Sequence, residues 1–406
     1  MMPSSFNMYK KILIPVDNSE HSRCAEHLGV IIGKTSQAKI TGLHVYSSQF
    51  HQLRFKLLEE HLPDKYQHEE VLDYQRRVHS VLIDRGLELI SLEYMKHMKD
   101  ACVQQGIIFK EELIDGKNAD VIIDLAASHD LVILGALGMG AVSNGTRLGS
   151  NSRRVVSTVH SDVLITRKSC ELKNIVVTID GSNYSEKIVQ KAAQMAKAFD
   201  ATLTIMTCFD PGLHSVVFKS LTEVLSKQAG KVFKFNEQKQ LHNQVIDQSL
   251  ENLYIQNLEK AQKLAEPYEI ALKTELLRGK PYLVISEKLR DMNADLCIVG
   301  RFGMHRGKYA CIGSTAERIV EVAPTNVLVM SLDNGVLETS APEEPQKVMD
   351  GPYETLIWDD EAKKRLENIP VFARPMAVLA IERYAREHHI NLITPEVMME
   401  ARNHYE

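Results

Sequence analysis

The sequence has no long hydrophobic run. No apolar stretch approaches the roughly 18 to 20 residues that a membrane-spanning helix requires, and the apolar stretch near the start, Ile12 to Val16, has the length of a strand. The first residues, MMPSSFNMYKKILIPVD, lack the basic start, apolar middle and small-residue cleavage site of a signal peptide. We therefore expect a cytoplasmic protein with no membrane partner.

Paired cysteines and an excess of basic charge are also missing. The six cysteines form no C-x-x-C pair, and several lie in apolar runs, such as Cys297 in DLCIVG, so we expect buried free thiols. The net charge is −5, from 48 basic and 53 acidic residues. Because nucleic-acid binders usually carry a basic face, we expect no nucleic-acid partner. With 44% hydrophobic residues in 406, the chain can build two or three domains.

What the sequence does contain is a repeat. KKILIPVDNSEHS and KNIVVTIDGSNYS are both apolar runs that end in Asp-x-Ser-x-x-Ser. Their aspartates, Asp17 and Asp180, lie 163 positions apart, and the glycines that end a later strand, Gly135 and Gly300, lie 165 apart. The offset between the copies changes by only two residues over a unit of this length, which indicates a duplicated domain rather than a short solenoid repeat.

Each copy alternates predicted strands with helical stretches. A helix follows the first strand, and we expect Ser22 to be its N-cap. Continuous apolar strands separated by helices predict an α/β fold, a parallel sheet covered on both faces. The strands are expected at 11–16, 39–45, 107–114, 131–134 and 163–166, and again at 174–179, 202–207, 272–277, 296–299 and 326–330.

Two long charged segments, 47–93 and 210–250, interrupt the copies at corresponding places. Both are periodic enough to be helical insertions. They could be lids or partner surfaces, and the residues do not decide between the two.

The sharpest motif is a glycine loop in the second copy, GRFGMHRGKYACIGSTAERIV. Gly300 and Gly303 leave a strand, and nine residues later Gly313 precedes Ser314, the expected N-cap of a helix. The free amides and positive dipole of a helix start suit phosphate oxygens. Positive charge along the loop is expected from Arg301, His305, Arg306 and Lys308.

The aspartates and glycines are expected to meet. Asp17 and Gly135 both lie at carboxyl ends of strands, where an open parallel sheet binds ligands if the strands are neighbours at the reversal of strand order. The same holds for Asp180 and Gly300. Taken alone, each aspartate could merely cap the following helix in an Asx-turn.

The spacing G-x-x-G-x9-G-[ST], with an aspartate at the end of the first strand, resembles the ATP-binding branch of the universal stress protein family. The resemblance covers residues 8–168 and 172–332. It implies two tandem five-stranded, Rossmann-like domains that pack as a pseudo-dimer through their last strands. It further implies a stress-response regulator that binds ATP, ADP or AMP, with or without Mg²⁺, and acts through nucleotide-dependent partner binding. A homodimer is also possible under this resemblance.

The resemblance also assigns residues. In the second copy Asp180 meets the ribose or phosphate, the base is approached by Thr178, Ile179 and Cys208, and the phosphates are held by Gly300, Gly303, Gly313, Ser314 and Thr315. The first-copy equivalents are Pro15, Val16, Asp17, Val45, Gly135, Gly138, Gly149, Ser150 and Asn151. Ten residues separate Gly138 from Gly149 where the motif has nine, so we expect the first site to be weak or empty.

The chain ends in a different kind of sequence. Residues 333–355, rich in proline, glycine and acidic residues, are a predicted linker, and residues 356–406 a small all-helical domain in which Thr394 caps a helix that starts at Pro395. The motifs W-x-x-E-A, L-x-x-I-P-x-F-x-R, I-E-R-Y-A-R-E and I-T-P-E-V resemble the small C-terminal domain of the light-independent protochlorophyllide reductase B subunit. The reductase body and any cluster-binding cysteine are absent from this tail, so we interpret it as a helical interaction module for a protein partner.

Catalytic patterns are not evident. No Walker lysine follows the glycine loop, and no Ser-His-Asp order stands out. We assign no catalytic residue and no metal ligand, and favour binding over catalysis. Two alternatives stay open: a slow ATP-hydrolysing enzyme, and a nucleotide-free scaffold that recruits partners through the C-terminal module.

Overall fold

A computed structural model describes residues 8–140, 148–210, 247–304, 311–331, 356–367, 374–388 and 390–405. The chain divides into two compact units. The first comprises Met1–Pro211 and Gln248–Val336, and the second comprises Gly212–Asp247 and Leu337–Glu406.

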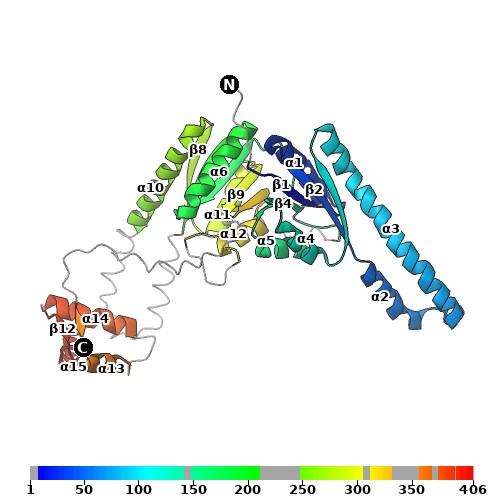
Figure 1. Ribbon diagram of the computed structural model, residues 1–406. Helices are drawn as coiled ribbons and strands as arrows, with labels where there is room; N and C mark the ends of the chain where they lie inside the picture. The colour runs from blue at the N-terminus through cyan, green and yellow to red at the C-terminus, as the bar shows by residue number, and fades with distance from the viewer. Residues whose placement is uncertain are drawn as a thin grey trace. The chain divides into compact units, whose positions relative to one another are not determined.

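The first unit is a 10-stranded sheet with helices on both faces (Figure 1). Its strands are β1 (Lys11–Pro15), β2 (Lys39–Tyr46), β3 (Phe109–Asp115), β4 (Leu131–Gly135), β5 (Asp162–Thr166), β6 (Asn174–Ile179), β7 (Thr202–Phe209), β8 (Leu272–Arg278), β9 (Leu296–Gly300) and β10 (Asn326–Met330). Its described helices are α1 (Glu20–Ser36), α2 (Ser48–Leu58), η1 (Glu59–His61), η2 (Asp64–Tyr66), α3 (Glu69–Gln104), α4 (Asn118–Ala126), α5 (Ser150–Thr158), α6 (Asn183–Phe199), α10 (Asp247–Ala265), η4 (Glu266–Tyr268), α11 (Pro281–Asp291) and α12 (Ser314–Val322).

The strand order is β3-β2-β1-β4-β5-β10-β9-β6-β7-β8. Each half of the sheet is five parallel strands, as predicted. The two last strands, β5 and β10, are the one antiparallel pair in this order, with Leu328 opposite Leu164. The halves are therefore joined edge to edge through their last strands, as the family resemblance implies.

The core follows from the strand sequences. In β1, Ile12 and Ile14 enter one hydrophobic cluster and Leu13 enters the other, because successive side chains of a strand point to opposite faces. Helices α1, α3, α6 and α10 cover the first face, and α4, α5, α11 and α12 cover the second. Both clusters contain residues of both halves, so the two domains share one continuous core.

Helix α1 begins one residue after Ser19, not after Ser22. The Ser19 side chain accepts a hydrogen bond from the Ser22 N–H (3.1 Å), which makes Ser19 the N-cap. The prediction for Ser22 was wrong because two serines lie within one turn and the structure uses the earlier one. This leaves the Ser22 hydroxyl to accept from the Asp17 N–H (3.2 Å).

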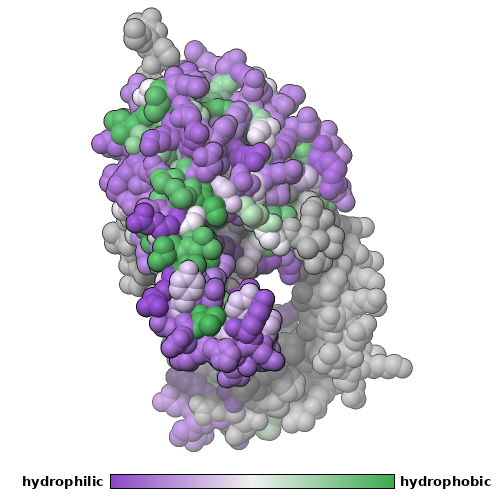
Figure 2. All heavy atoms as spheres, turned by 90° about the vertical axis from the view of Figure 1, so that its right-hand side faces the viewer, coloured by the Kyte–Doolittle hydropathy of each residue, from purple (hydrophilic) through white to green (hydrophobic). Residues whose placement is uncertain are grey.

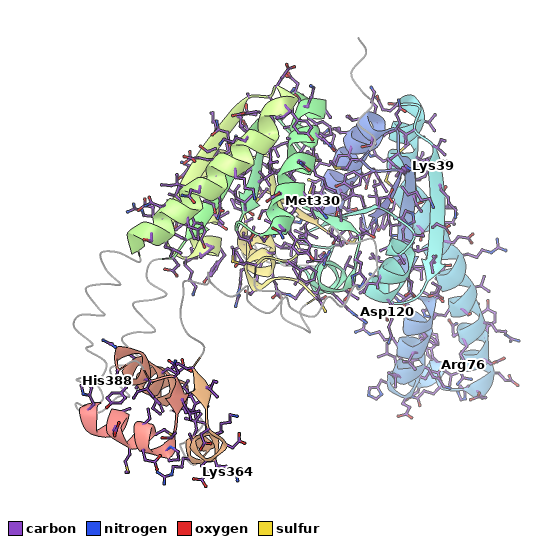
Figure 3. All side chains as sticks on the ribbon, turned by 60° about the vertical axis from the view of Figure 1, so that its left-hand side comes forward. Lys39, Arg76, Asp120, Met330, Lys364 and His388 are labelled. Atoms are coloured by element: carbon purple, nitrogen blue, oxygen red, sulfur yellow. The ribbon has the colours of Figure 1, made fainter. Side chains whose placement is uncertain are left out.

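The first helical insertion is α2, η1, η2 and most of the 36-residue helix α3. Arg76 of α3, labelled in Figure 3, holds Glu59 of η1 with two hydrogen bonds of 2.8 Å. Phe55 of α2 stacks on His79. Figure 2 views this side of the molecule and shows hydrophobic side chains gathered on its surface. Of the second insertion, residues 211–246 lie outside the described residues, as does the predicted linker.

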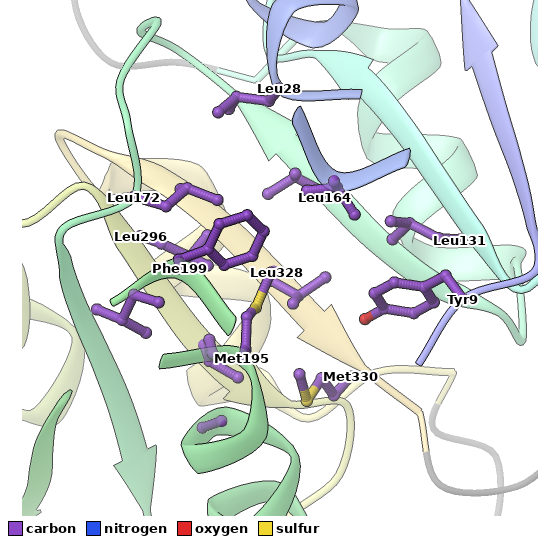
Figure 4. Packing of buried hydrophobic residues seen from close by; sticks show 14 of the residues in the cluster. Tyr9, Leu28, Leu131, Leu164, Leu172, Met195, Phe199, Leu296, Leu328 and Met330 are labelled. Atoms are coloured by element: carbon purple, nitrogen blue, oxygen red, sulfur yellow. The ribbon is translucent and has the colours of Figure 1, made fainter. Parts of the chain in front are cut away.

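Figure 4 shows the apolar packing at the junction between the halves, and hydrogen-bonded polar groups accompany it. Asp162 accepts hydrogen bonds from the Tyr9 hydroxyl (2.9 Å) and the Ser331 N–H (2.7 Å). At the pseudo-symmetric position, Asn326 accepts from the Arg167 N–H (2.8 Å). Buried polar groups paired in this way fix one register of the two edge strands.

The six cysteines are all free, as expected, but not all are buried. Cys102 and Cys297 lie in the core, whereas Cys311 is exposed because it precedes α12 outside the packed face. None of the helices in the described parts of the chain has both the length and the apolarity that a membrane crossing demands.

The second unit contains its own small core. Helices α13 (Asp360–Glu367), α14 (Arg374–Glu387) and α15 (Pro395–Tyr405) pack with the short parallel strands β11 (Ile357–Trp358) and β12 (Leu392–Ile393). The unit is mainly helical, as expected, with this two-stranded pair added. Helix α15 starts at Pro395, and Thr394 accepts from the Val397 N–H (3.5 Å), as predicted for its cap.

Candidate functional site

A crevice lies at each reversal of strand order. Strand β1 pairs with β2 on one side and β4 on the other, and β6 pairs with β7 and β9 in the same way. Asp17 lies two residues after the end of β1, and Gly135 is the last residue of β4. The two residues therefore meet at one crevice, as predicted, and Asp180 and Gly300 do the same.

The crevice of the second domain is a pocket of about 290 Å³. All nine residues assigned to this site from the sequence line it: Thr178, Ile179, Asp180, Cys208, Gly300, Gly303, Gly313, Ser314 and Thr315.

The Asp180 carboxylate ties two segments of the pocket together. Its Oδ1 accepts from the Ser182 N–H (3.0 Å) and the Ser185 hydroxyl (2.8 Å), and its Oδ2 accepts from the Met304 N–H (2.6 Å). Burial raises the pKa of Asp180, but the hydrogen bonds from Ser182, Ser185 and Met304 outweigh burial and hold the pKa below its ordinary value. The group is thus an Asx-turn acceptor and, in addition, an anionic clamp on the glycine loop.

The glycines are required by close contacts. A Cβ atom on Gly303 would lie 2.4 Å from the Asp180 Oδ2, and one on Gly300 would lie 2.6 Å from the Ile188 Cδ1. Gly181, between Asp180 and Ser182, has a φ of 82°, a left-handed conformation that glycine adopts without strain. The loop can approach the carboxylate because Gly303 carries no side chain.

Helix α12 begins at the pocket with its first amides uncapped. Its N-cap is Gly313, with no side-chain capping bond, and Ser314 is the first helical residue rather than the predicted cap. The difference arises because the Gly313 N–H is already used by the Arg301 carbonyl (2.7 Å), which fixes Gly313 at the boundary. The amides of the first turn, from Ser314 onward, are the groups left to bind an anion.

Arg301 does not serve the pocket, which corrects the expectation of loop charge there. Its side chain is 3% exposed and donates to the Ser331 Oγ (2.6 Å), the Val156 carbonyl (2.6 Å) and the Ser161 carbonyl (3.3 Å). Burial lowers its pKa to about 10, so it stays protonated at neutral pH. Arg301 joins the second domain to the first; the other predicted cations, His305, Arg306 and Lys308, lie outside the described residues.

The first domain repeats the same framework around a pocket of about 400 Å³. Asp17 Oδ2 accepts from the Met139 N–H (3.0 Å), and the Gly149 N–H donates to the Ala136 carbonyl (2.8 Å). Both hydrogen bonds match those of the second domain. The one additional residue of the first-domain loop therefore lies in the sequence between Met139 and Gly149. The nine predicted residues line this pocket: Pro15, Val16, Asp17, Val45, Gly135, Gly138, Gly149, Ser150 and Asn151.

Several residues of the pockets were not found from the sequence. Ser185 binds Asp180, and the Asp-x-Ser-x-x-Ser repeat is the signal that could have identified it. Tyr254 of α10 also lines the second pocket, and it comes from a segment with no motif. Burial raises the pKa of Cys208 to about 12, with Asp210 adding to the shift, so this thiol is protonated and is no nucleophile at neutral pH.

The fold and the pockets define a doubly wound α/β protein with a crevice at each reversal of strand order, where proteins of this class bind ligands. The chain belongs to the universal stress protein family, whose model matches residues 8–167 and 171–331. Residues 358–402 match a second family, described as the proto-chlorophyllide reductase 57 kD subunit.

Individual relatives agree with this placement. A putative universal stress protein of Staphylococcus epidermidis is 31% identical over 159 residues, which is 39% of this chain and 83% of that protein. A universal stress protein of Synechocystis is 26% identical over 210 residues, 52% of this chain and 60% of that protein. The crystal structure of a universal stress protein from Archaeoglobus fulgidus covers 80% of this chain and 97% of its own, with 18% identity and a TM-score of 0.50, and shows the same fold.

Proposed function

We propose that this chain binds ATP or a related adenine nucleotide in the second-domain pocket, and that occupancy regulates a protein partner in a cytoplasmic stress response. The observation that carries the proposal is the pairing of a clamped glycine loop with an uncapped helix start in one pocket. Backbone amides and a helix dipole bind phosphate without needing a lysine. The adenine preference comes from the family resemblance.

Different residues of the second-domain pocket contact the phosphates, the base and the ribose of the nucleotide. Gly300, Gly303 and the first turn of α12 receive the phosphates. Thr178, Ile179 and Cys208 approach the base. Asp180 faces the ribose while its hydrogen bonds hold the loop. The described residues contain no cluster of three potential metal ligands, so Mg²⁺ would be brought to this pocket by the nucleotide phosphates rather than held by a protein cage.

Isothermal titration with ATP, ADP and AMP tests the proposal. We expect binding to the wild type that is lost in the double variant Gly303→Val, Asp180→Ala. The matched variant Gly138→Val, Asp17→Ala changes the equivalent positions of the first domain and should retain the main binding event. Absence of binding to the wild type at millimolar ligand would end the nucleotide proposal, and binding that survives the second-domain variant would mean that the site is elsewhere.

Two alternatives are separated by simple measurements. Phosphate release above background that disappears in Asp180→Ala would favour a slow ATP-hydrolysing enzyme. Nucleotide released on denaturing the purified protein, and detected by chromatography, would count against a nucleotide-free scaffold. In the described pocket the one carboxylate already accepts three hydrogen bonds that hold the loop, which favours binding over hydrolysis.

A further inference from the structure

Helix α3 carries an apolar stripe that the fold does not cover. The stripe consists of six side chains that are each 42% to 66% exposed: Tyr74, Val78, Val81, Leu82, Leu89 and Leu92. More than half of the large exposed hydrophobic side chains in the described residues lie on α2 and α3. Figure 2 shows this side of the molecule, with hydrophobic side chains gathered in patches. An exposed apolar patch of this length indicates an interaction surface.

Two other faces of α3 are already occupied. Arg76 contacts η1, His79 contacts α2 and Leu72 is buried, and Met95 and Met98 are buried against the sheet. The stripe lies on neither of these faces, because its members recur at spacings of three and four residues along a third side of the helix. It is thus a fixed, preformed surface of the first unit.

We propose that the stripe docks against the same stripe of a second copy of this chain, in antiparallel orientation about a twofold axis near Arg85. Val78, Leu82, Arg85, Leu89 and Leu92 are spaced four, three, four and three residues apart, a pattern that places apolar residues opposite apolar residues when it is read in the reverse direction. A surface that complements itself is what an isologous twofold interface needs.

Charge also favours a second copy. Arg85 lies in the centre of the stripe, and Glu88 lies at its edge one turn further on; both are exposed. In the antiparallel pair each Arg85 lies within about one helical turn, roughly 5 Å along the axis, of Glu88 in the other copy. An arginine in the middle of the stripe is unsuited to lipid tails but is matched by the acidic group of a twofold-related helix.

The area is sufficient for a weak specific dimer. From Tyr74 to Leu92 the stripe is about 27 Å long. Burying its apolar side chains together with Arg85 and Glu88 on both copies removes on the order of 1,200 Å² from water, which is at the lower end of specific interfaces. We therefore expect association at roughly micromolar concentration. This association is independent of the nucleotide proposal.

Sedimentation velocity of the full chain between about 1 and 100 µM tests the interface. The wild type should shift with concentration from 45.8 kDa toward twice that mass. Leu82→Glu together with Leu89→Glu should raise the dissociation constant at least about tenfold. Ile108→Glu, at a similarly exposed position outside the stripe, should leave it unchanged. A wild type that stays monomeric throughout, or a dimer that survives Leu82→Glu with Leu89→Glu, would overturn the proposal.

Charge reversal gives a sharper test that needs no apolar change. Arg85→Glu alone and Glu88→Arg alone should each weaken the dimer, because each removes the Arg85–Glu88 pairs between the copies and leaves charges of one sign around the axis. Mixing the two variants should restore it as a heterodimer, since acidic and basic pairs then face each other. Failure of the mixture to associate would exclude the antiparallel register. Binding of the wild type to vesicles with an anionic lipid, without self-association, would assign the stripe to a membrane instead.

Discussion

Asp180 shows how one side chain can hold the loop of the candidate site. Its carboxylate receives hydrogen bonds from both walls of the pocket, and Gly303 permits the approach. Asp17 and Gly138 repeat the contact in the first domain, where a Cβ on Gly138 would lie 2.7 Å from the Asp17 Oδ2. The glycines therefore serve the protein's own carboxylate as well as any ligand.

Gly303→Ala should pull the glycine loop away from the Asp180 carboxylate. The added methyl group would lie 2.4 Å from the Asp180 Oδ2 and would displace the Met304 amide from it. We expect ATP to bind at least about tenfold more weakly, a loss of about 1.4 kcal/mol, by isothermal titration. Gly140→Ala is the control, because a Cβ there meets nothing within 4 Å. An unchanged affinity in Gly303→Ala would show that the clamp does not shape the site.

Acid should release the clamp. The pKa of Asp180 in the folded chain lies below its ordinary value, so its contribution to stability is present above about pH 4, the pKa of an unfolded aspartate, and is lost as the pH falls through the folded value. Denaturant unfolding should show Asp180→Asn less stable than the wild type at pH 6. The difference should shrink toward pH 3. A difference that is the same at both pH values would contradict this account.

At the scale of elements, the strands were the most predictable part. Each expected strand exists, and no boundary differs from its predicted position by more than two residues. The inner strands are continuous apolar runs buried on both faces, whereas the edge strands β3 and β8 also carry charged residues. The pocket residues followed because they are tied to strand ends. The fate of Arg301 could not be predicted, since its partners Val156 and Ser161 belong to the other domain and become neighbours when β5 pairs with β10.

Arg301 should therefore be a stability residue rather than a ligand residue. Arg301→Ala removes the donor to the carbonyls of Val156, Ser161 and Cys311 and to the Ser331 hydroxyl. We expect a loss of about 3 kcal/mol in the free energy of unfolding. Arg318→Ala removes an exposed ion pair within α12 and should cost below about 0.5 kcal/mol. Equal losses in both variants would show that the junction network is not stabilising.

At the scale of the whole molecule, the first unit is two domains with one core. Both hydrophobic clusters cross the β5–β10 junction, and the paired edges carry buried hydrogen bonds. The second unit has a separate cluster of its own. Cooperative unfolding should follow these clusters, because residues that share a packed core open together.

Hydrogen exchange with bound ATP tests this division. A ligand that binds only the folded state stabilises it by about 2.7 kcal/mol when its concentration is 100 times the dissociation constant. If the two domains unfold as one, amides in β1 and β5 of the first domain should gain protection along with those of β6 and β9 in the second. Amides of α14, which belongs to the separate C-terminal cluster, should exchange as before. Protection confined to the second domain would mean that the shared core does not couple the two halves. In that case ATP binding would stabilise the second domain and the first domain would still open at its original rate.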